Sequence, residues 1–227
     1  MSSFAERYQG PGDLPGQIPA FPLRGAILLP RAVLRLNVFE RRYLAMVDDA
    51  LATARLLLIV QPAGAGESES PPGKSEPLKR VGCIGRLTAY QEIEDGRMLI
   101  TLSGIARCLL GEEIDSEKPY RLWAVSSQRY AADFVAGCGE CDVDRDRLLK
   151  TLKSYLQARQ LRADWAAIER SPNETLVNAL SIMSPYGPEE KQALLEAPDL
   201  KTRAEVLIAL AEMELASGSD GSGTALQ

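Results

Sequence analysis

The sequence predicts an α+β fold: a mainly antiparallel β-sheet that closes toward a barrel, followed by an α-helical bundle. From Ile18 to about Gln128, short apolar runs alternate with turn residues, and only one helical pattern interrupts them. From about Asp142 to Ala216, the apolar spacing becomes helical instead. Strands and helices do not alternate along the chain, which disfavours a doubly wound parallel sheet.

The first half contains several strand patterns. A short apolar run enters at Phe21 and ends at Pro30, and further strands are expected at Val33–Val38, Leu56–Gln61, Val81–Ile93, Met98–Leu110 and Tyr120–Ser126. The third and fourth of these five flank Asp95-Gly96, a residue pair that favours a type I′ hairpin turn. These two runs are therefore expected to form a hairpin.

One helix is expected among the strands, from about Phe39 to Ala54. Asn37 is a plausible N-cap, because Glu40 follows three residues later at the spacing of a capping box. Leu44, Val47 and Leu51 then form one apolar stripe that can pack onto a sheet.

The segment from Pro62 to Pro77 is rich in Gly, Ser, Pro and Glu, and it is interpreted as an exposed loop. Its Gly73-Lys74-Ser75 resembles the end of a phosphate-binding loop. That motif needs a glycine five residues earlier, where this chain has Ser68, and a helix should follow rather than Glu76-Pro77. We therefore expect no nucleotide site here.

The second half predicts a bundle with well-defined helix starts. We expect a helix from about Asp144 to Gln160, another capped by Ser171 with Pro172 in its first turn, a short one opening at Gly187-Pro188, and a final one capped by Asp199. The side chains expected to face inward are Leu148, Leu152, Tyr155 and Leu156, then Leu176, Val177, Leu180 and Met183, then Leu194 and Leu195, and finally Leu200, Val206, Leu207, Leu210 and Met213.

These patterns divide the chain into five parts. We expect a flexible tail over 1–16, the β domain over 17–128, a linker over 129–141, the helical bundle over 142–216 and a disordered tail over 217–227. A chain of 227 residues can bury a core without help from disulfides or metals.

The composition excludes several classes of function. The chain has no histidine, so a Ser-His-Asp triad, a Cys-His dyad and histidine-based zinc or iron sites cannot be built within it. The net charge of −5 disfavours nucleic acid as a partner. No apolar run approaches the roughly 20 residues that span a bilayer, and no secretory signal is recognisable. The expected location is the cytoplasm, without a membrane partner.

Cys138-Gly139-Glu140-Cys141 is the one C-x-x-C motif. A thiol near a helix N-terminus can be reactive, so one interpretation is a redox or metal site using Cys138 and Cys141. A zinc site needs four ligands, whereas Cys83 and Cys108 lie in apolar strand patterns. The other interpretation is a linker with two ordinary thiols, and we expect no bound metal or cofactor.

Charged and aromatic residues open the lone helix of the β domain, at Glu40, Arg41, Arg42 and Tyr43. They form either a solvated helix face or a contact surface for a partner. These four are the candidate binding residues, and no catalytic residue is proposed.

The order of these motifs resembles the N-terminal domain of Lon proteases. The resemblance covers about residues 18–215, and the residues that carry it are Ile18–Arg24, Pro30, Phe39–Tyr43, Val81-Gly82, Asp95–Arg97, Gly104, Arg107, Leu176–Leu180, Glu190–Gln192, Leu194–Glu196 and Arg203. The C-x-x-C has no counterpart in that pattern.

The resemblance implies a PUA-like β domain followed by a helical bundle, and a protein of the peptidase S16 family that is itself non-catalytic. It implies a module that binds unfolded proteins or peptides, with a full-length Lon protease as a further partner. This chain has no Walker motif and no Ser-Lys protease segment, so it resembles only the recognition part. A thiol-redox or metal-stabilised protein, and an RNA-contacting PUA-like module, are the alternatives.

Overall fold

The computed structural model describes residues 8–64 and 76–220, and it divides into two compact units. The first unit comprises the chain up to Ala136 together with Tyr186–Leu195, and the second comprises Gly137–Pro185 and the chain from Glu196 onward. The short helix after Pro188 therefore belongs with the β unit, although the sequence pattern places it in the 142–216 bundle.

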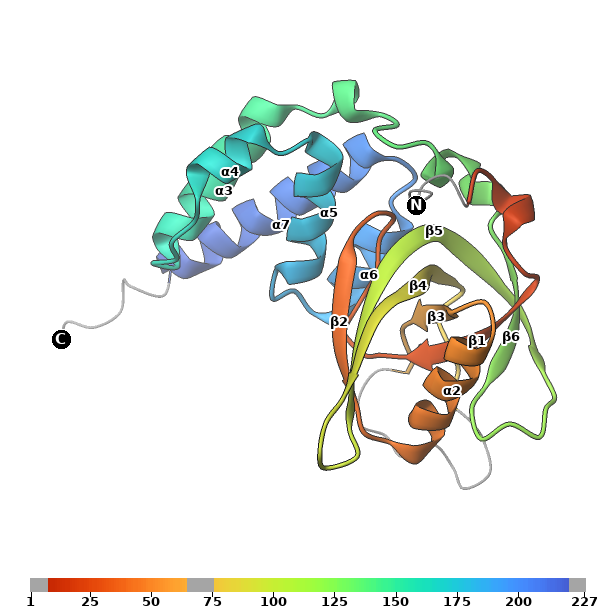
Figure 1. Ribbon diagram of the computed structural model, residues 1–227. Helices are drawn as coiled ribbons and strands as arrows, with labels where there is room; N and C mark the ends of the chain where they lie inside the picture. Colours follow the sequence, from red (N-terminus) through yellow and green to blue (C-terminus); the bar gives the residue numbers. More distant parts are fainter. Residues whose placement is uncertain (1–7, 65–75, 221–227) are drawn as a thin grey trace. The chain divides into compact units, whose positions relative to one another are not determined.

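The first unit is built on a six-stranded sheet (Figure 1). Its strands are β1 (Gln17–Pro22), β2 (Val33–Val38), β3 (Leu56–Val60), β4 (Val81–Glu92), β5 (Met98–Ile114) and β6 (Leu122–Ser126). The strand order is β2-β5-β4-β3-β1-β6, and β6 also pairs with β5. Five strands thus close into a barrel, while β2 lies outside it on β5. Among the described strands, only the β1–β3 pairing is parallel, so the prediction of a mainly antiparallel barrel is confirmed.

The barrel can close because β5 is long and curved, as Figure 1 shows. Its first part pairs with β2 and its last part with β6, and β-bulges interrupt its pairing with β4 and β6. At Gly104, a Cβ atom would overlap the carbonyl oxygen of Leu29. Position 104 therefore requires glycine, because the segment after β1 packs directly against the backbone of β5 there.

The hairpin between β4 and β5 forms where the sequence predicts it, but with a different turn. The amide of Gly96 donates to the carbonyl of Ile93 (2.9 Å), and the amide of Ile93 donates to the carbonyl of Arg97 (2.9 Å). Gly96 has φ +81°, whereas Asp95 is not in the left-handed region. A type I′ turn needs both. The prediction of type I′ is therefore wrong, and the loop has one more residue, with glycine in the left-handed position.

Helix α2 (Arg41–Ala52) is the helix expected among the strands, but its cap and buried face differ. Its N-cap is Glu40, without a side-chain capping bond, because Asn37 is still part of β2. The buried residues are Tyr43, Met46, Val47 and Ala50, so the inward face is rotated from the predicted stripe. The ring of Tyr43 contacts the ring of Phe21 on β1, with centroids 4.4 Å apart.

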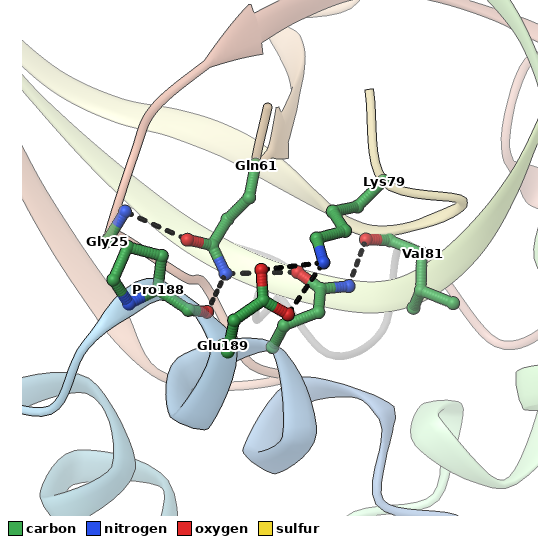
Figure 2. Close-up of polar contacts among 7 residues, drawn as sticks. Gly25, Gln61, Lys79, Val81, Pro188 and Glu189 are labelled. Atoms are coloured by element: carbon green, nitrogen blue, oxygen red, sulfur yellow. Dashed lines mark hydrogen bonds and ion pairs between the residues drawn. The ribbon is translucent and has the colours of Figure 1, made fainter. Parts of the chain in front are cut away.

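Helix α6 (Pro188–Glu196) is fixed to the barrel by a polar network around Gln61 (Figure 2). The amide nitrogen of Gln61 donates to the carbonyl of Pro188 (2.9 Å) and to the side-chain oxygen of Gln192 (3.0 Å), and its oxygen accepts from the amide of Gly25 (2.8 Å). Gln61 itself is only 1% exposed. Buried amides stabilise a fold only when they are paired, so this network specifies where α6 packs.

A buried ion pair ties β5 to the segment after β6. Arg107, on β5, donates from Nη2 to Oδ1 of Asp133 (2.8 Å), and both its Nε and its backbone amide donate to Oδ2 (2.9 Å each). Arg107 also lies over the ring of Tyr130, and its Nη1 donates to the carbonyl of Leu195 on α6. Burial alone would lower the pKa of Arg107, but the hydrogen bond and the charge of Asp133 outweigh it and raise that pKa.

The second unit is helical. Its helices are α3 (Arg145–Ala158), α4 (Trp165–Arg170), α5 (Asn173–Met183) and α7 (Leu200–Asp220). Asp144 caps α3 through the amide of Arg147 (3.0 Å), and Asp199 accepts from the amide of Thr202 (2.8 Å) at the start of α7. Both starts lie where the sequence predicts them.

Three predictions for the helices are wrong in detail. Ser171 does not cap α5: its hydroxyl donates back to the carbonyl of Ala167, and the N-cap is Pro172. Met183 and Met213 were expected to face inward but are 79% and 66% exposed. In α5 polar residues such as Ser181 are buried instead, and the hydroxyl of Ser181 donates to the carbonyl of Val177.

Parts of the two predicted tails, 1–16 and 217–227, are ordered. Tyr8 is buried in the core of the β unit, and a 3-10 turn, η1 (Pro11–Asp13), follows it. At the other end α7 continues to Asp220. Most of the 62–77 loop and the outermost ends, over 1–7, 65–75 and 221–227, lie outside the described residues.

We expect Asp133→Ala to lower the free energy of unfolding by about 3–5 kcal/mol, since it leaves the buried guanidinium of Arg107 without its carboxylate. Urea denaturation of the intact chain measures this. Asp95→Ala is the matched control, because it breaks an exposed pair with Arg97 and should change stability little. Equal losses in the two variants would contradict the importance of burial at Arg107.

Candidate binding site

A polar hollow of about 450 Å³ lies on the first unit, where α2 begins beside β1. Four segments that are distant in sequence form it: β1 and the turn after it, the start of α2, the described ends of the connection between β3 and β4, and the connection between β5 and β6. We call it the Tyr43 hollow, and it is lined by Ala20, Pro22, Arg24, Glu40, Arg42, Tyr43, Pro62, Glu76, Leu78, Pro119, Tyr120 and Arg121.

Three arginines surround the Tyr43 hollow, and each is held by a glutamate. Arg24 Nη2 lies 2.9 Å from Oε1 of Glu76, and Arg42 Nε donates to Oε2 of Glu40 (2.9 Å). These pairs are partly exposed, so they orient the guanidinium groups more than they stabilise the fold.

Arg121 is the most firmly placed of the three arginines. Its Nε and Nη2 donate to the two carboxylate oxygens of Glu113 (2.7 and 2.6 Å), and its Nη1 donates to the carbonyl of Glu76 (2.7 Å). The hydrogen bond from Arg121 lowers the pKa of Glu113. This bidentate geometry leaves Arg121 with little freedom to move.

Tyr43 is a buried aromatic side chain of the hollow, at 8% exposed. The guanidinium of Arg42 lies over its ring, 4.5 Å from the centroid. Burial raises the pKa of Tyr43, while Arg42 and Arg121 act to lower it and Glu40 acts to raise it. The phenol is therefore protonated at neutral pH.

Tyr120 fixes the far side of the hollow to α2. Its hydroxyl donates to Oδ2 of Asp49 (2.6 Å), and Lys118 Nζ lies 2.8 Å from the same oxygen. Hydrogen bonds from Lys118 and then Tyr120 lower the pKa of Asp49, and burial with the Asp49 contact raises the pKa of Tyr120. The connection between β5 and β6 is thus attached to the helix that carries Tyr43.

The structure brings three of the four candidate residues together. Glu40, Arg42 and Tyr43 line the hollow, whereas Arg41 does not. The arginines from outside α2, Arg24 and Arg121, were not predicted as site residues. Arg24 ends the apolar motif that begins at Ile18, but nothing local marks Arg121, because only barrel closure brings it to this place.

Cys138 and Cys141 lie in the second unit, on the turn before η3 (Glu140–Asp142) and within it. Both are free and exposed, whereas Cys83 and Cys108 are free and buried. Within the part of the chain that the structure describes, no three Cys, Asp, Glu or His side chains are grouped as a metal site would require. A redox or metal role for Cys138 and Cys141 stays a prediction.

A second hollow, of about 440 Å³, lies on the outer face of β2, β5 and β4. We call it the Tyr90 hollow, and it is lined by Arg35, Leu36, Asn37, Ala89, Tyr90, Gln91, Leu99, Ile100 and Thr101. Tyr90 and Leu99 are 51% and 43% exposed, and β2 pairs with β5 on only one side within the described sheet.

Comparison with known proteins decides the family. The model of the ATP-dependent protease La (LON) substrate-binding domain matches residues 17–212. The chain belongs to the family of Lon substrate-binding domains. Among curated relatives, the Lon protease of Heliobacterium modesticaldum is 24% identical over 213 residues, and that of Flavobacterium johnsoniae is 24% identical over 206 residues. These matches cover 88% and 89% of this chain but 24% and 25% of the relatives, so the chain spans about a quarter of their length.

Two solved structures have the same fold. The N-terminal domain of the Mycobacterium avium complex Lon protease matches with a TM-score of 0.62 and 21% identity, covering 86% of this chain and 98% of that one. The Lon N-terminal domain protein from Xanthomonas campestris matches with a TM-score of 0.57 and 19% identity, covering 85% and 97%. In residues 8–64 and 76–220, no helix has the length and apolar character needed to cross a bilayer.

We expect Tyr120→Phe to raise the pKa of Asp49, because it removes one of the two hydrogen bonds that stabilise the carboxylate. A carboxyl whose pKa is depressed by folding stabilises the protein above its unfolded pKa and loses that contribution as the pH falls. The ¹³C resonance of the Asp49 carboxyl, followed by NMR against pH, measures the change. Tyr43→Phe is the control, and an unchanged titration in Tyr120→Phe would contradict the contact.

Proposed function

We propose that this Lon substrate-binding domain is a non-catalytic recognition module that binds extended segments of unfolded proteins in the Tyr43 hollow. The match to the substrate-binding domain over 17–212 is the observation that carries this proposal. The absence of histidine from the whole chain supports the non-catalytic part, because common nucleophile–base pairs need that residue.

The geometry of the hollow supports binding rather than catalysis. The lining combines three oriented guanidinium groups and two tyrosines with apolar surface from Ala20 and Leu78. Ligand sites commonly combine apolar walls with a few fixed polar groups in this way. An extended segment could place its backbone and polar side chains against the arginines and an apolar side chain on the floor.

The same proposal includes the partners. A full-length Lon protease is the partner that the family suggests, since the Lon proteases it matches are about four times as long as the aligned part. The net charge of −5 speaks against nucleic acid as the ligand.

A peptide array tests the proposal. We expect the purified chain to bind a subset of overlapping ten-residue peptides from an unfolded protein, and Arg42→Ala to weaken that binding about tenfold. Arg35→Ala is the matched control, because it removes an exposed arginine from the Tyr90 hollow. If Arg35→Ala weakens peptide binding and Arg42→Ala does not, the binding site is the Tyr90 hollow instead. If the chain binds no peptide at all, the proposed function is wrong.

A further inference from the structure

The hydroxyl of Tyr43 is a donor that no described residue uses. Its side chain is 8% exposed, and its hydroxyl makes no hydrogen bond with any residue among those described. Because Tyr43 lines the hollow, this hydroxyl is open to a partner from outside the fold.

The groups around this hydroxyl identify what the partner must offer. The guanidinium of Arg42 lies over the ring of Tyr43, 4.5 Å from its centroid, and Arg121 and Glu40 line the same hollow. The phenol is protonated at neutral pH, so it donates. An occupant that brings an acceptor can use this donor.

The arginines add further donors to the same space. A guanidinium has five N–H groups. Arg121 uses Nε, Nη1 and Nη2 once each, and Arg42 directs Nε and Nη2 to Glu40. N–H groups remain on both arginines that no described residue accepts. Glu113 and Glu40 already hold these guanidinium groups in place. Binding therefore does not carry the entropic cost of ordering the two arginine side chains.

We propose that the Tyr43 hollow binds a carboxylate of the captured segment, either its C-terminus or an acidic side chain. This inference rests on the proposed function and names the chemical class that the site selects. A carboxylate offers two acceptor oxygens, one for the phenol and one for a guanidinium.

The charge of the hollow favours a carboxylate over a phosphate. Each of its three arginines is paired with a glutamate, so the hollow carries little net charge. A carboxylate adds only one negative charge beside these glutamates. A phosphate carries nearly two and would also meet Glu40 and Glu76 at close range.

Binding of one peptide in four forms tests the proposal. The probe is the N-terminally biotinylated decapeptide GSGLASFALS, made with a C-terminal amide, with a free C-terminal carboxylate, as an amide with its last serine replaced by glutamate, and as an amide with that serine phosphorylated. Affinity for the intact chain is measured by biolayer interferometry. We expect the free acid, the glutamate form or both to bind about tenfold tighter than the neutral amide; which of them gains identifies the source of the carboxylate.

Tyr43→Phe keeps the ring and removes only the hydroxyl. It should reduce the preference for the carboxylate forms several-fold while the neutral amide binds as before, and Arg35→Ala should leave the preference intact. Equal binding of neutral and carboxylate forms would overturn the inference and leave the proposed function standing. Tightest binding of the phosphorylated form, or an unchanged preference in Tyr43→Phe, would overturn the carboxylate assignment. Binding of none of the forms would overturn the proposed function as well.

Discussion

The Tyr43 hollow depends on the double pairing of β6. This strand forms backbone hydrogen bonds with β1 on one side and with the end of β5 on the other, and it thereby closes the barrel. Closure brings the segment before β6, with Tyr120 and Arg121, next to the start of α2. The four segments of the hollow are otherwise separated by long stretches of chain. The backbone pairing of this five-residue strand therefore positions Tyr120 and Arg121 in the hollow.

Close backbone contacts and buried polar groups support that closure. Glycine at position 104 lets the chain after β1 lie on β5, and the Arg107–Asp133 pair attaches β5 to the segment after β6. Gln61 then specifies where α6 packs on the barrel. Polar groups buried at this depth tolerate only one arrangement of their partners, because any other leaves a donor or a charge unpaired. They give the barrel one arrangement, and the barrel and α2 in turn position the arginines of the hollow.

The sequence predicted where most helices and strands lie, but not which elements pair with or pack against one another. Hydrophobic periodicity and capping residues located the strands, the lone helix and the starts of α3 and α7, because these are local properties of the chain. The pairing of β6 with two strands is not local, and Arg121 was therefore missed. Helix α6 shows the same limit. Its leucines indicate a helix with a buried face, but only the contact of Gln192 with Gln61 shows that the face packs on the barrel.

The candidate site was partly accessible from the sequence. The charged start of α2 drew attention to Glu40, Arg42 and Tyr43, which do line one hollow. The pattern did not reveal that Tyr43 is buried, because the helix face was predicted from Leu44, Val47 and Leu51 and is in fact rotated. Hairpin turn type failed for a comparable reason: Asp95-Gly96 permits two loops, and strand pairing selects the longer one.

Tyrosine NMR tests most directly whether the Tyr43 hollow is where a peptide segment binds. The chain has seven tyrosines, and selective ¹³C labelling of their rings reports on both hollows in one experiment. On titration with the free-acid decapeptide, we expect the resonances of Tyr43 and Tyr120 to shift together while that of Tyr90 stays in place. Movement of Tyr90 with Tyr43 and Tyr120 unchanged would contradict it.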